Sequence, residues 1–169
     1  MTTSPLLFEP LRIRDCVLPN RIVVSPLCQY SAVEGMAQPW HMAHLSSFAR
    51  GKSGLVFTEA TAVEARGRIT PECLGIWNDA QAEALKPIVS FIESMGCVPG
   101  IQLAHAGRKG SASAPFSKKR GLPLTADDSH TGATPWQCVA PSALPVGPGW
   151  PQPEALDEAG LEEIREAFK

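Results

Sequence analysis

Three short apolar segments, each followed at once by polar residues, constrain the fold of this chain more than any other feature. They cover residues 22–25, 54–60 and 98–103. Runs of β-branched and other apolar residues of this length predict buried strands. Segments with helical periodicity separate them, and strands that alternate with helices form βαβ units around a parallel sheet. The sequence therefore predicts an α/β fold with three parallel strands.

The two helices between these strands carry clear end signals. The first covers residues 40–50, and Gly51 ends it because glycine is favoured just beyond the last helical turn. Asn78 or Asp79 caps the second, with Gln81 three residues after Asn78, as in a capping box. Apolar residues at i, i+3, i+4 and i+7 predict one buried face on this second helix: Leu85, Ile88, Val89 and Ile92.

Outside these units the chain is less regular. Residues 6–11 open an amino-terminal segment that we expect to close over one end of the fold. Residues 110–153 are rich in Gly, Pro, Ser and Asp, and a loop of this length is uncommon unless it is functional. We interpret it as an excursion over the carboxyl ends of the strands that holds a short hairpin. A last helix is expected after Asp157, with Leu161, Ile164 and Phe168 on one face.

Polar side chains follow every predicted strand. The carboxyl ends of parallel strands meet at one edge of a sheet or one mouth of a barrel, where such folds place their active sites. We therefore expect a site built from these residues: Cys28, Tyr30, Thr58, Glu59, Gln102 and His105.

The composition excludes several classes of function. Lys and Arg (15) nearly balance Asp and Glu (17), so the chain has no strong charge with which to hold nucleic acid or an anionic membrane. No apolar run approaches the ~20 residues that span a bilayer, and the amino terminus does not resemble a signal peptide. We therefore expect neither a nucleic-acid partner nor a membrane partner.

The five cysteines are odd in number and widely spread, with no C-x-x-C pair. A disulfide framework or a structural zinc site would look different, so reduced thiols in the cytoplasm are the better interpretation. Four of the cysteines are expected to be buried apolar side chains or inert surface thiols: Cys16, Cys73, Cys97 and Cys138.

Three other chemical hypotheses are weaker. The sequence GKSG at residues 51–54 lies between a helix and a strand, whereas a phosphate-binding loop lies between a strand and a helix. His41 and His44 share a helical face and could ligate a metal with Cys28 or Cys73 as a partner, but no third ligand lies at a recognisable spacing. Cys28 could act as a nucleophile with His105 as its base, although a thiol needs an activating cation or helix N-terminus nearby.

Several motifs together resemble the Old Yellow Enzyme family of FMN-dependent ene-reductases, in the branch with bacterial xenobiotic reductases and thermostable ene-reductases. The resemblance runs over the whole chain, in order and at family-like spacing. The matching segments are NRI at 20–22, SPLCQY at 25–30, WHMAH at 40–44, EATAV at 59–63, GRIT at 67–70 and GIQLAHAGRK at 100–109.

The resemblance implies a (β/α)₈ TIM barrel that holds FMN at the carboxyl ends of its strands. NAD(P)H would reduce the flavin, which would pass hydride to an activated alkene such as an enone. A barrel of this kind takes about 250 residues. Residues 1–169 would then supply the first three βα units, a long loop and the start of the next helix, as the amino-terminal portion of one FMN-binding domain.

The resemblance also implies roles for individual residues. Ser25, Pro26, Leu27 and Cys28 would line the flavin, with the Cys28 thiol near N5 and O4. Ala60 would face the ring, the Gln102 amide would bind the pyrimidine edge, and Tyr30 would lie in the substrate pocket. No catalytic residue and no metal ligand is expected within this chain. The family's His-x-x-His pair, its tyrosine proton donor, the arginine near flavin N1 and the phosphate-binding loops would lie beyond Lys169.

The sequence is also compatible with two other functional hypotheses. One is a truncated, non-catalytic fragment that binds FMN poorly or not at all. The other is a metal or thiol hydrolase built on Cys28, His41 and His44. The expected partners are a small alkene substrate and either a second copy of the chain or the missing carboxyl-terminal half of the same barrel.

Overall fold

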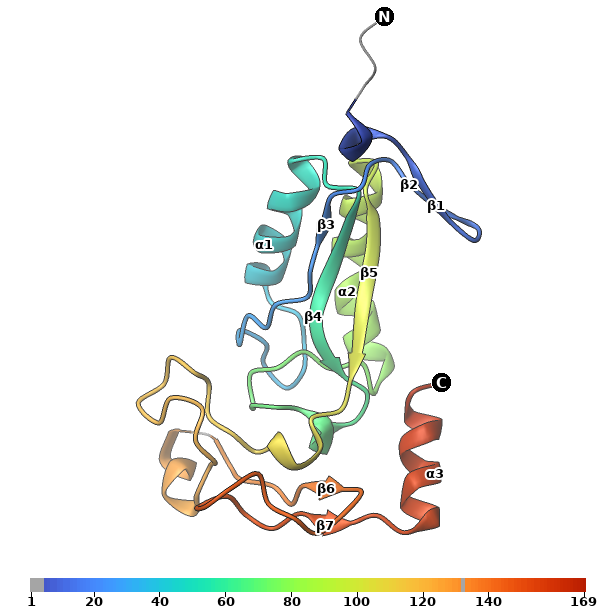
Figure 1. The fold of residues 1–169 in the computed structure, drawn as a ribbon. Coiled ribbons are helices and arrows are strands. Elements are labelled where there is room, and N and C mark those ends of the chain that lie inside the picture. The colour runs from blue at the N-terminus through green and yellow to red at the C-terminus, as the bar shows by residue number, and fades with distance from the viewer. Residues whose placement is uncertain (1–4, 132) are drawn as a thin grey trace, which may run out of the picture.

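A three-stranded parallel sheet forms the centre of the computed structural model, which describes residues 5–131 and 133–169. Its strands are β3 (Val23–Val24), β4 (Leu55–Ala62) and β5 (Val98–Ala104), in the order β3-β4-β5. Both pairs are parallel (Figure 1), which confirms the predicted βαβ arrangement. β3 is shorter than expected, and Pro26, which has no N–H to donate, follows soon after it. β4 extends two residues beyond the predicted end.

Two helices, α1 (Pro39–Arg50) and α2 (Asp79–Ser94), follow the first two strands and pack against each other and the sheet. The core lies between these layers. Leu45 and Ala49 enter it from α1, Val56 from β4, and Leu85, Ile88 and Ile92 from α2. The predicted apolar face of α2 is therefore confirmed, except that Val89 is only partly buried.

The helix ends follow local chemistry. Gly51 caps α1 at its C-terminus, as expected, so the GKSG segment ends a helix and does not open one. Asn78 Oδ1 accepts the backbone N–H of Gln81 at 3.0 Å, which makes Asn78 the N-cap of α2. The capping-box prediction is wrong in one respect. The Gln81 side chain does not return to Asn78, because it accepts from Trp77 N and donates to Glu34 O.

The amino-terminal segment consists of a 3₁₀ turn, η1 (Leu6–Phe8), and an antiparallel hairpin of β1 (Leu11–Ile13) and β2 (Cys16–Leu18). It lies at the amino-terminal end of the central strands, where we expected a closing segment (Figure 1). In this structure it projects away from the sheet, and its large apolar side chains are exposed: Leu6, Leu7, Phe8, Ile13 and Val17.

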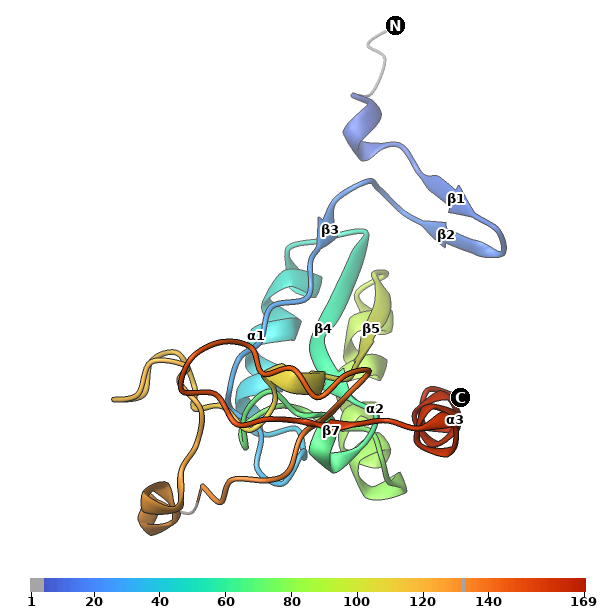
Figure 2. The same cartoon turned by 60° about the horizontal axis from the view of Figure 1, so that its bottom comes forward.

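The long excursion lies across the carboxyl ends of the strands, as predicted (Figures 1 and 2). It contains η4 (Ala126–Thr131), β6 (Val139–Ala140) and β7 (Glu154–Ala155), after the short turns η2 (Ala65–Gly67) and η3 (Gly107–Lys109) that follow β4 and β5. A short antiparallel pairing lies inside the excursion, as the predicted hairpin requires: Ala112 bridges Pro123, and Ser113 N donates to Leu122 O at 2.9 Å. β6 and β7, by contrast, pair in parallel.

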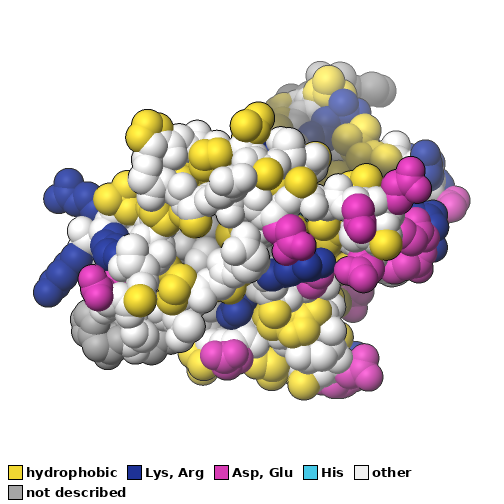
Figure 3. Space-filling model, turned by 90° about the horizontal axis from the view of Figure 1, so that it is seen from below, with side chains coloured by type: hydrophobic (Ala, Val, Ile, Leu, Met, Phe, Trp, Pro, Cys, Tyr) yellow, Lys and Arg dark blue, Asp and Glu magenta, His cyan; other side chains and the backbone are white. Residues whose placement is uncertain are grey.

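The last element is α3 (Glu158–Ala167), and Asp157 caps it as expected by accepting the Gly160 N–H at 2.8 Å. Figure 3 views the molecule from the carboxyl ends of the strands and shows charged side chains gathered over α3 on the right. The three central strands form an open sheet and not a closed barrel. Among the described residues, no helix combines the length and the apolar character needed to cross a bilayer.

Candidate functional site

Three of the residues expected in the site are neighbours at the carboxyl ends of β3, β4 and β5. Ala60 lies opposite Gln102 in the β4–β5 register. Cys28 follows β3, which pairs with β4, and the backbone of Ala60 in β4 acts to lower the pKa of the Cys28 thiol. The parallel sheet thus brings together side chains from three segments that are distant in sequence.

These residues form an open surface. Ser25, Leu27 and Gln102 are exposed, whereas Pro26, Cys28, Ala60 and Tyr30 are partly buried. Among residues 5–131 and 133–169, the Gln102 amide has no hydrogen-bond partner, so its donors and its acceptor are free for a ligand.

A bulge in β4 explains why its polar end does not face this surface. The β4–β5 register shifts between Phe57 and Ala60, and both Thr58 and Glu59 are buried. Bulges of this kind re-aim side chains next to functional sites. The Thr58 and Thr61 hydroxyls both donate to the backbone carbonyl of Glu59, at 3.2 and 2.8 Å, which holds the bulge in place.

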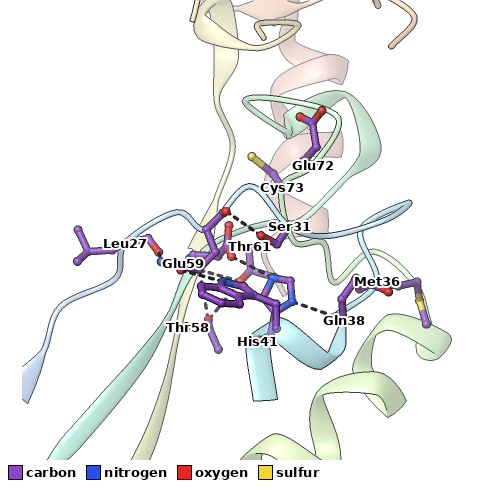
Figure 4. Close-up of polar contacts among 12 residues, drawn as sticks. Leu27, Ser31, Met36, Gln38, His41, Thr58, Glu59, Thr61, Glu72 and Cys73 are labelled. Atoms are coloured by element: carbon purple, nitrogen blue, oxygen red, sulfur yellow. Dashed lines mark hydrogen bonds and ion pairs between the residues drawn. The ribbon is translucent and has the colours of Figure 1, made fainter. Parts of the chain in front are cut away.

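Glu59 therefore does not lie at the mouth of the sheet, where the sequence predicted it. Its carboxylate is buried against α1, and Oε1 lies 3.2 Å from Nε2 of His41, which is also buried (Figure 4). His41 Nδ1 accepts the Gln38 N–H at 2.9 Å, so Nε2 carries the proton. Neither Glu59 oxygen receives a well-aligned hydrogen bond from the described residues. The pair borders a cavity of about 20 Å³, which has room for about one water molecule.

The histidines give little support to a metal site. His44 stacks on Trp40 at 6.1 Å and meets the edge of Phe48 at 5.0 Å. Burial lowers the pKa of His44, which keeps the ring neutral in this aromatic setting. No group of three or more His, Cys, Asp or Glu side chains in the described part of the chain could hold a metal ion.

His105 is not positioned as a base for Cys28. Its Nε2 lies 2.7 Å from Glu64 Oε1, and its Nδ1 accepts the Gly107 N–H at 3.0 Å. Both ring nitrogens are therefore used in fixing the turn that follows β5. The predicted Cys28–His105 nucleophile pair is not formed.

The side chain with the largest effect on the Cys28 thiol is Cys73, which we expected only as a possible metal partner or an inert thiol. The burial of Cys73 agrees with the expectation of a small buried side chain. The influence of Cys73, followed by burial, raises the pKa of the Cys28 thiol. The influence of Cys28 lowers the pKa of Cys73 to about 7 against the effect of burial, and Thr70 assists it. No local spacing links Cys73 to Cys28, so only the fold reveals this influence.

Tyr30 connects the site to the long excursion. Its backbone has φ of +50°, in the left-handed region, and its ring meets Phe116 edge-on at 5.7 Å. Burial, followed by the charge of the nearby thiols, raises the pKa of the Tyr30 hydroxyl, so it stays protonated near neutral pH. Tyr30 can therefore donate a hydrogen bond beside Cys28.

Comparison with known proteins identifies the setting of this surface. The model of the NADH:flavin oxidoreductase / NADH oxidase family matches residues 6–137. An NADH:flavin oxidoreductase of Gibberella zeae is 41% identical over 98% of this chain and 39% of its own length. An NADPH dehydrogenase of a Geobacillus species is 36% identical over 97% of this chain and 42% of its own length.

The fold comparison agrees. Morphinone reductase superposes with a TM-score of 0.75 and 25% identity, over 98% of this chain and 43% of its own. The Old Yellow Enzyme homologue of Zymomonas mobilis superposes with a TM-score of 0.73 and 26% identity, over 97% of this chain and 43% of its own. The chain spans about two fifths of the length of the curated relatives it matches. It belongs to the NADH:flavin oxidoreductase / NADH oxidase family, the family of Old Yellow Enzyme, and its open sheet is part of that family's TIM barrel.

Proposed function

We propose that this chain carries part of the FMN site of an NAD(P)H-dependent oxidoreductase that reduces activated C=C bonds, such as those of enones. Residues 1–169 then form the amino-terminal portion of a single FMN-binding barrel domain. The observation that carries the proposal is the adjacency of Cys28, Ala60 and Gln102 at the ends of three neighbouring strands. The carboxyl ends of barrel strands are where such enzymes place their sites.

The chemistry of these residues fits a flavin. The pyrimidine edge of a flavin alternates hydrogen-bond donors and acceptors, and a carboxamide such as Gln102 can serve either. The Gln102 amide is exposed and unengaged by the described residues. Ala60 lies opposite it, with a side chain small enough for a flat ring to approach the backbone.

Bound FMN would supply the redox chemistry, accepting hydride from NAD(P)H and delivering it to the β-carbon of the alkene. Ser25, Pro26 and Leu27 would line the ring, and Tyr30 would donate a hydrogen bond to the substrate. The Cys28 thiol, whose pKa is raised by Cys73 and by burial, would contact the flavin in its protonated form.

The openness of the surface also supports a second proposal, that residues 1–169 alone bind FMN weakly and are inactive. Ser25, Leu27 and Gln102 are exposed rather than enclosed. We infer that either a further segment of the barrel or a second copy of the chain completes the site. Purified residues 1–169 should then lack the flavin absorbance band near about 450 nm, whereas the complete protein should show it. The free cysteines support a reducing, cytoplasmic setting.

The FMN proposal is tested with Gln102→Ala in the complete protein. Removing the partner of a buried polar edge costs about 1–3 kcal/mol, so FMN should bind more weakly on titration of the apoprotein. The matched control is Gln152→Ala, an exposed glutamine on the excursion whose amide is also free. The control should bind FMN like the wild type. Equal FMN affinity in Gln102→Ala and wild type would exclude the proposed role.

A further inference from the structure

The first turn of α1 contacts two of the segments that form the candidate site. The first is the end of β4, where Glu59 comes directly before Ala60. Glu59 Oε1 lies 3.2 Å from Nε2 of His41, the third residue of α1, and both side chains are only 1% exposed. Figure 4 shows the His41 ring beside the Glu59 side chain. The residue next to Ala60 is therefore attached to a helix that lies behind the sheet.

The second segment is the one that carries Cys28. Trp40 Nε1, also in the first turn of α1, donates to Gln29 Oε1 at 3.1 Å. The Gln29 amide in turn donates from Nε2 to Leu27 O at 2.9 Å. Leu27 and Gln29 flank Cys28 in the chain. The same helical turn thus contacts the residues on both sides of the thiol, directly at Gln29 and through Gln29 at Leu27.

The turn that makes these contacts is itself fixed. His41 Nδ1 accepts the Gln38 N–H at 2.9 Å, and Gln38 Nε2 donates to Met36 O at 3.0 Å. Pro39 is the first residue of the helix, where its fixed φ suits the helical conformation. The His41 ring is therefore held at one nitrogen by the helix end, and its other nitrogen faces Glu59. A ring held in this way can determine where the Glu59 side chain lies.

A buried carboxylate at this position costs stability. A polar group taken out of water is unfavourable unless it is well hydrogen-bonded, and neither Glu59 oxygen receives a well-aligned bond from the described residues. A well-packed apolar pair would avoid that cost. The cavity beside the pair is walled on its other sides by Ser25 and Leu27, among others, which we expect to line the flavin. The polar pair thus lies directly behind the proposed cofactor surface, where exact positions matter more than stability.

We propose that Glu59 is a positioning residue for the FMN surface. Through His41 it fixes the backbone of Ala60 relative to α1, while Trp40 fixes the Cys28 segment to the same helical turn. Glu59 and His41 are both buried, so they act on the cofactor through Ala60 and do not touch it. This inference rests on the proposed function, because it concerns the surface that we assign to the flavin.

The experiment titrates the apo form of the complete protein with FMN and records the visible absorption and circular dichroism of the bound flavin. Glu59→Leu leaves the His41 Nε2–H without an acceptor, so Ala60 should move. We expect the FMN dissociation constant to rise about tenfold and the flavin bands to shift. Glu59→Gln keeps an oxygen that can accept from His41, so it should restore the affinity and the bands to near those of the wild type.

A matched control separates positioning from stability. Ile92→Ala also changes a side chain that is 1% exposed, but Ile92 lies near the amino-terminal end of β5, where its carbonyl accepts the Cys97 N–H at 3.3 Å. Ile92→Ala should lower the melting temperature of the protein. It should leave the FMN affinity of the folded protein and the flavin bands unchanged.

Trp40→Phe tests the same helical turn at an exposed position. The Trp40 side chain is 53% exposed, and phenylalanine keeps a ring that can stack on His44, so the variant should fold. It removes only the donor to Gln29. FMN binding should weaken in the same direction as in Glu59→Leu, by a smaller factor. If Glu59→Leu does not fold, Trp40→Phe decides the test.

The outcomes separate this inference from the proposed function. Wild-type FMN affinity and flavin bands in Glu59→Leu would overturn the positioning role, as would an equal loss of affinity in Ile92→Ala. If Gln102→Ala weakens FMN binding and Glu59→Leu does not, only the positioning role is wrong. Wild-type affinity in both variants would overturn the proposed FMN site as well.

Discussion

Helices α2 and α3 have the same kind of sequence pattern, but only α2 is buried in the core. Each begins at an Asn or Asp cap, and each carries apolar residues spaced along one face. In α2 that face is buried, with Leu85, Ile88 and Ile92 in the core. In α3, all of which the structure describes, no residue is buried, and Leu161 and Phe168 are 50% and 40% exposed.

The difference between the helices shows that apolar periodicity predicts which face of a helix can be buried. It does not predict whether another element of the chain packs against that face. α2 has a partner because β4, β5 and α1 lie next to it. An ion pair joins α3 to the turn η2, with Arg66 Nη2 3.6 Å from Glu163 Oε2. A helix held by apolar burial and a helix held by charge should respond differently to mutation, concentration, pH and salt.

The largest expected effect is on assembly. Residues 1–169 alone expose the apolar face of α3 together with Ile101 and Leu103 on the edge strand β5. Unpaired edges and apolar patches promote association. We expect self-association that increases with concentration in sedimentation velocity, without a flavin band.

The double variant Leu161→Gln, Phe168→Gln should reduce this self-association. The matched control is Glu162→Gln on the charged face of α3, which should not reduce it. A monomer that stays soluble, yellow and cooperatively folded at all concentrations would show that the exposed face of α3 needs no cover.

The next effect is on folding stability. Ile92 in α2 is 1% exposed, so Ile92→Ala removes apolar contacts and leaves a cavity, at a cost of about 2–5 kcal/mol. Leu161→Ala in α3 should change the free energy of unfolding by only about 0.5 kcal/mol or less, because half of that side chain is already in water. Urea titrations of residues 1–169 at low protein concentration measure both. Similar costs at the two positions would mean that α3 is packed in solution.

A smaller effect is expected at the helix caps. Asn78 and Asp157 each accept the N–H three residues on, at 3.0 and 2.8 Å, and losing such a cap costs about 1 kcal/mol. Asn78→Ala should lower the free energy of global unfolding, since α2 is part of the core. Asp157→Ala should only speed local opening. Amide exchange separates the two, since α3 amides should exchange faster in Asp157→Ala while α2 amides stay protected.

The caps and helices were predictable because their signals are local. Gly51, Asn78 and Asp157 act within a few residues of their own position. The sequence placed Gly51 and Asp157 correctly and gave Asn78 as one of two candidates with Asp79. The parallel pairing of β6 with β7 was not predictable, because it joins two-residue strands across a long loop. No short-range pattern encodes which distant backbone groups pair.

The same limit applies to the candidate site. The sequence identified the strand ends, and the structure brings Cys28, Ala60 and Gln102 together there. It did not reveal that a bulge turns Glu59 inward to His41, or that Cys73 influences the pKa of Cys28. Both depend on side-chain directions set by register shifts and loop closure, which residue spacing alone does not determine.

The smallest effect concerns the charges that connect α3 to the turn η2. Glu64 accepts Arg66 Nε at 2.6 Å and lies 2.7 Å from His105 Nε2, while Arg66 also faces Glu163. Burial acts to raise the pKa of Glu64, but the bonds from Arg66 and His105 outweigh it and lower that pKa below its ordinary value. A carboxyl group whose pKa is lower in the folded than in the unfolded protein stabilises the fold. That contribution is complete at a pH above the ordinary pKa of about 4.5, and it is lost as the pH falls through the lowered pKa.

The attachment of α3 should therefore weaken in acid and in salt, whereas the packing of α2 should not. Side chains as exposed as Arg66 and Glu163 gain at most about 1 kcal/mol from an ion pair, and salt screens that gain. Glu163→Gln should speed amide exchange in α3 slightly at low salt and not at all at high salt. The matched control is Glu162→Gln, because Glu162 pairs with Arg165 inside α3 and not with η2. If the amide exchange rates of α3 do not change with pH, with salt or with Glu163→Gln, then contacts other than these charges hold the helix.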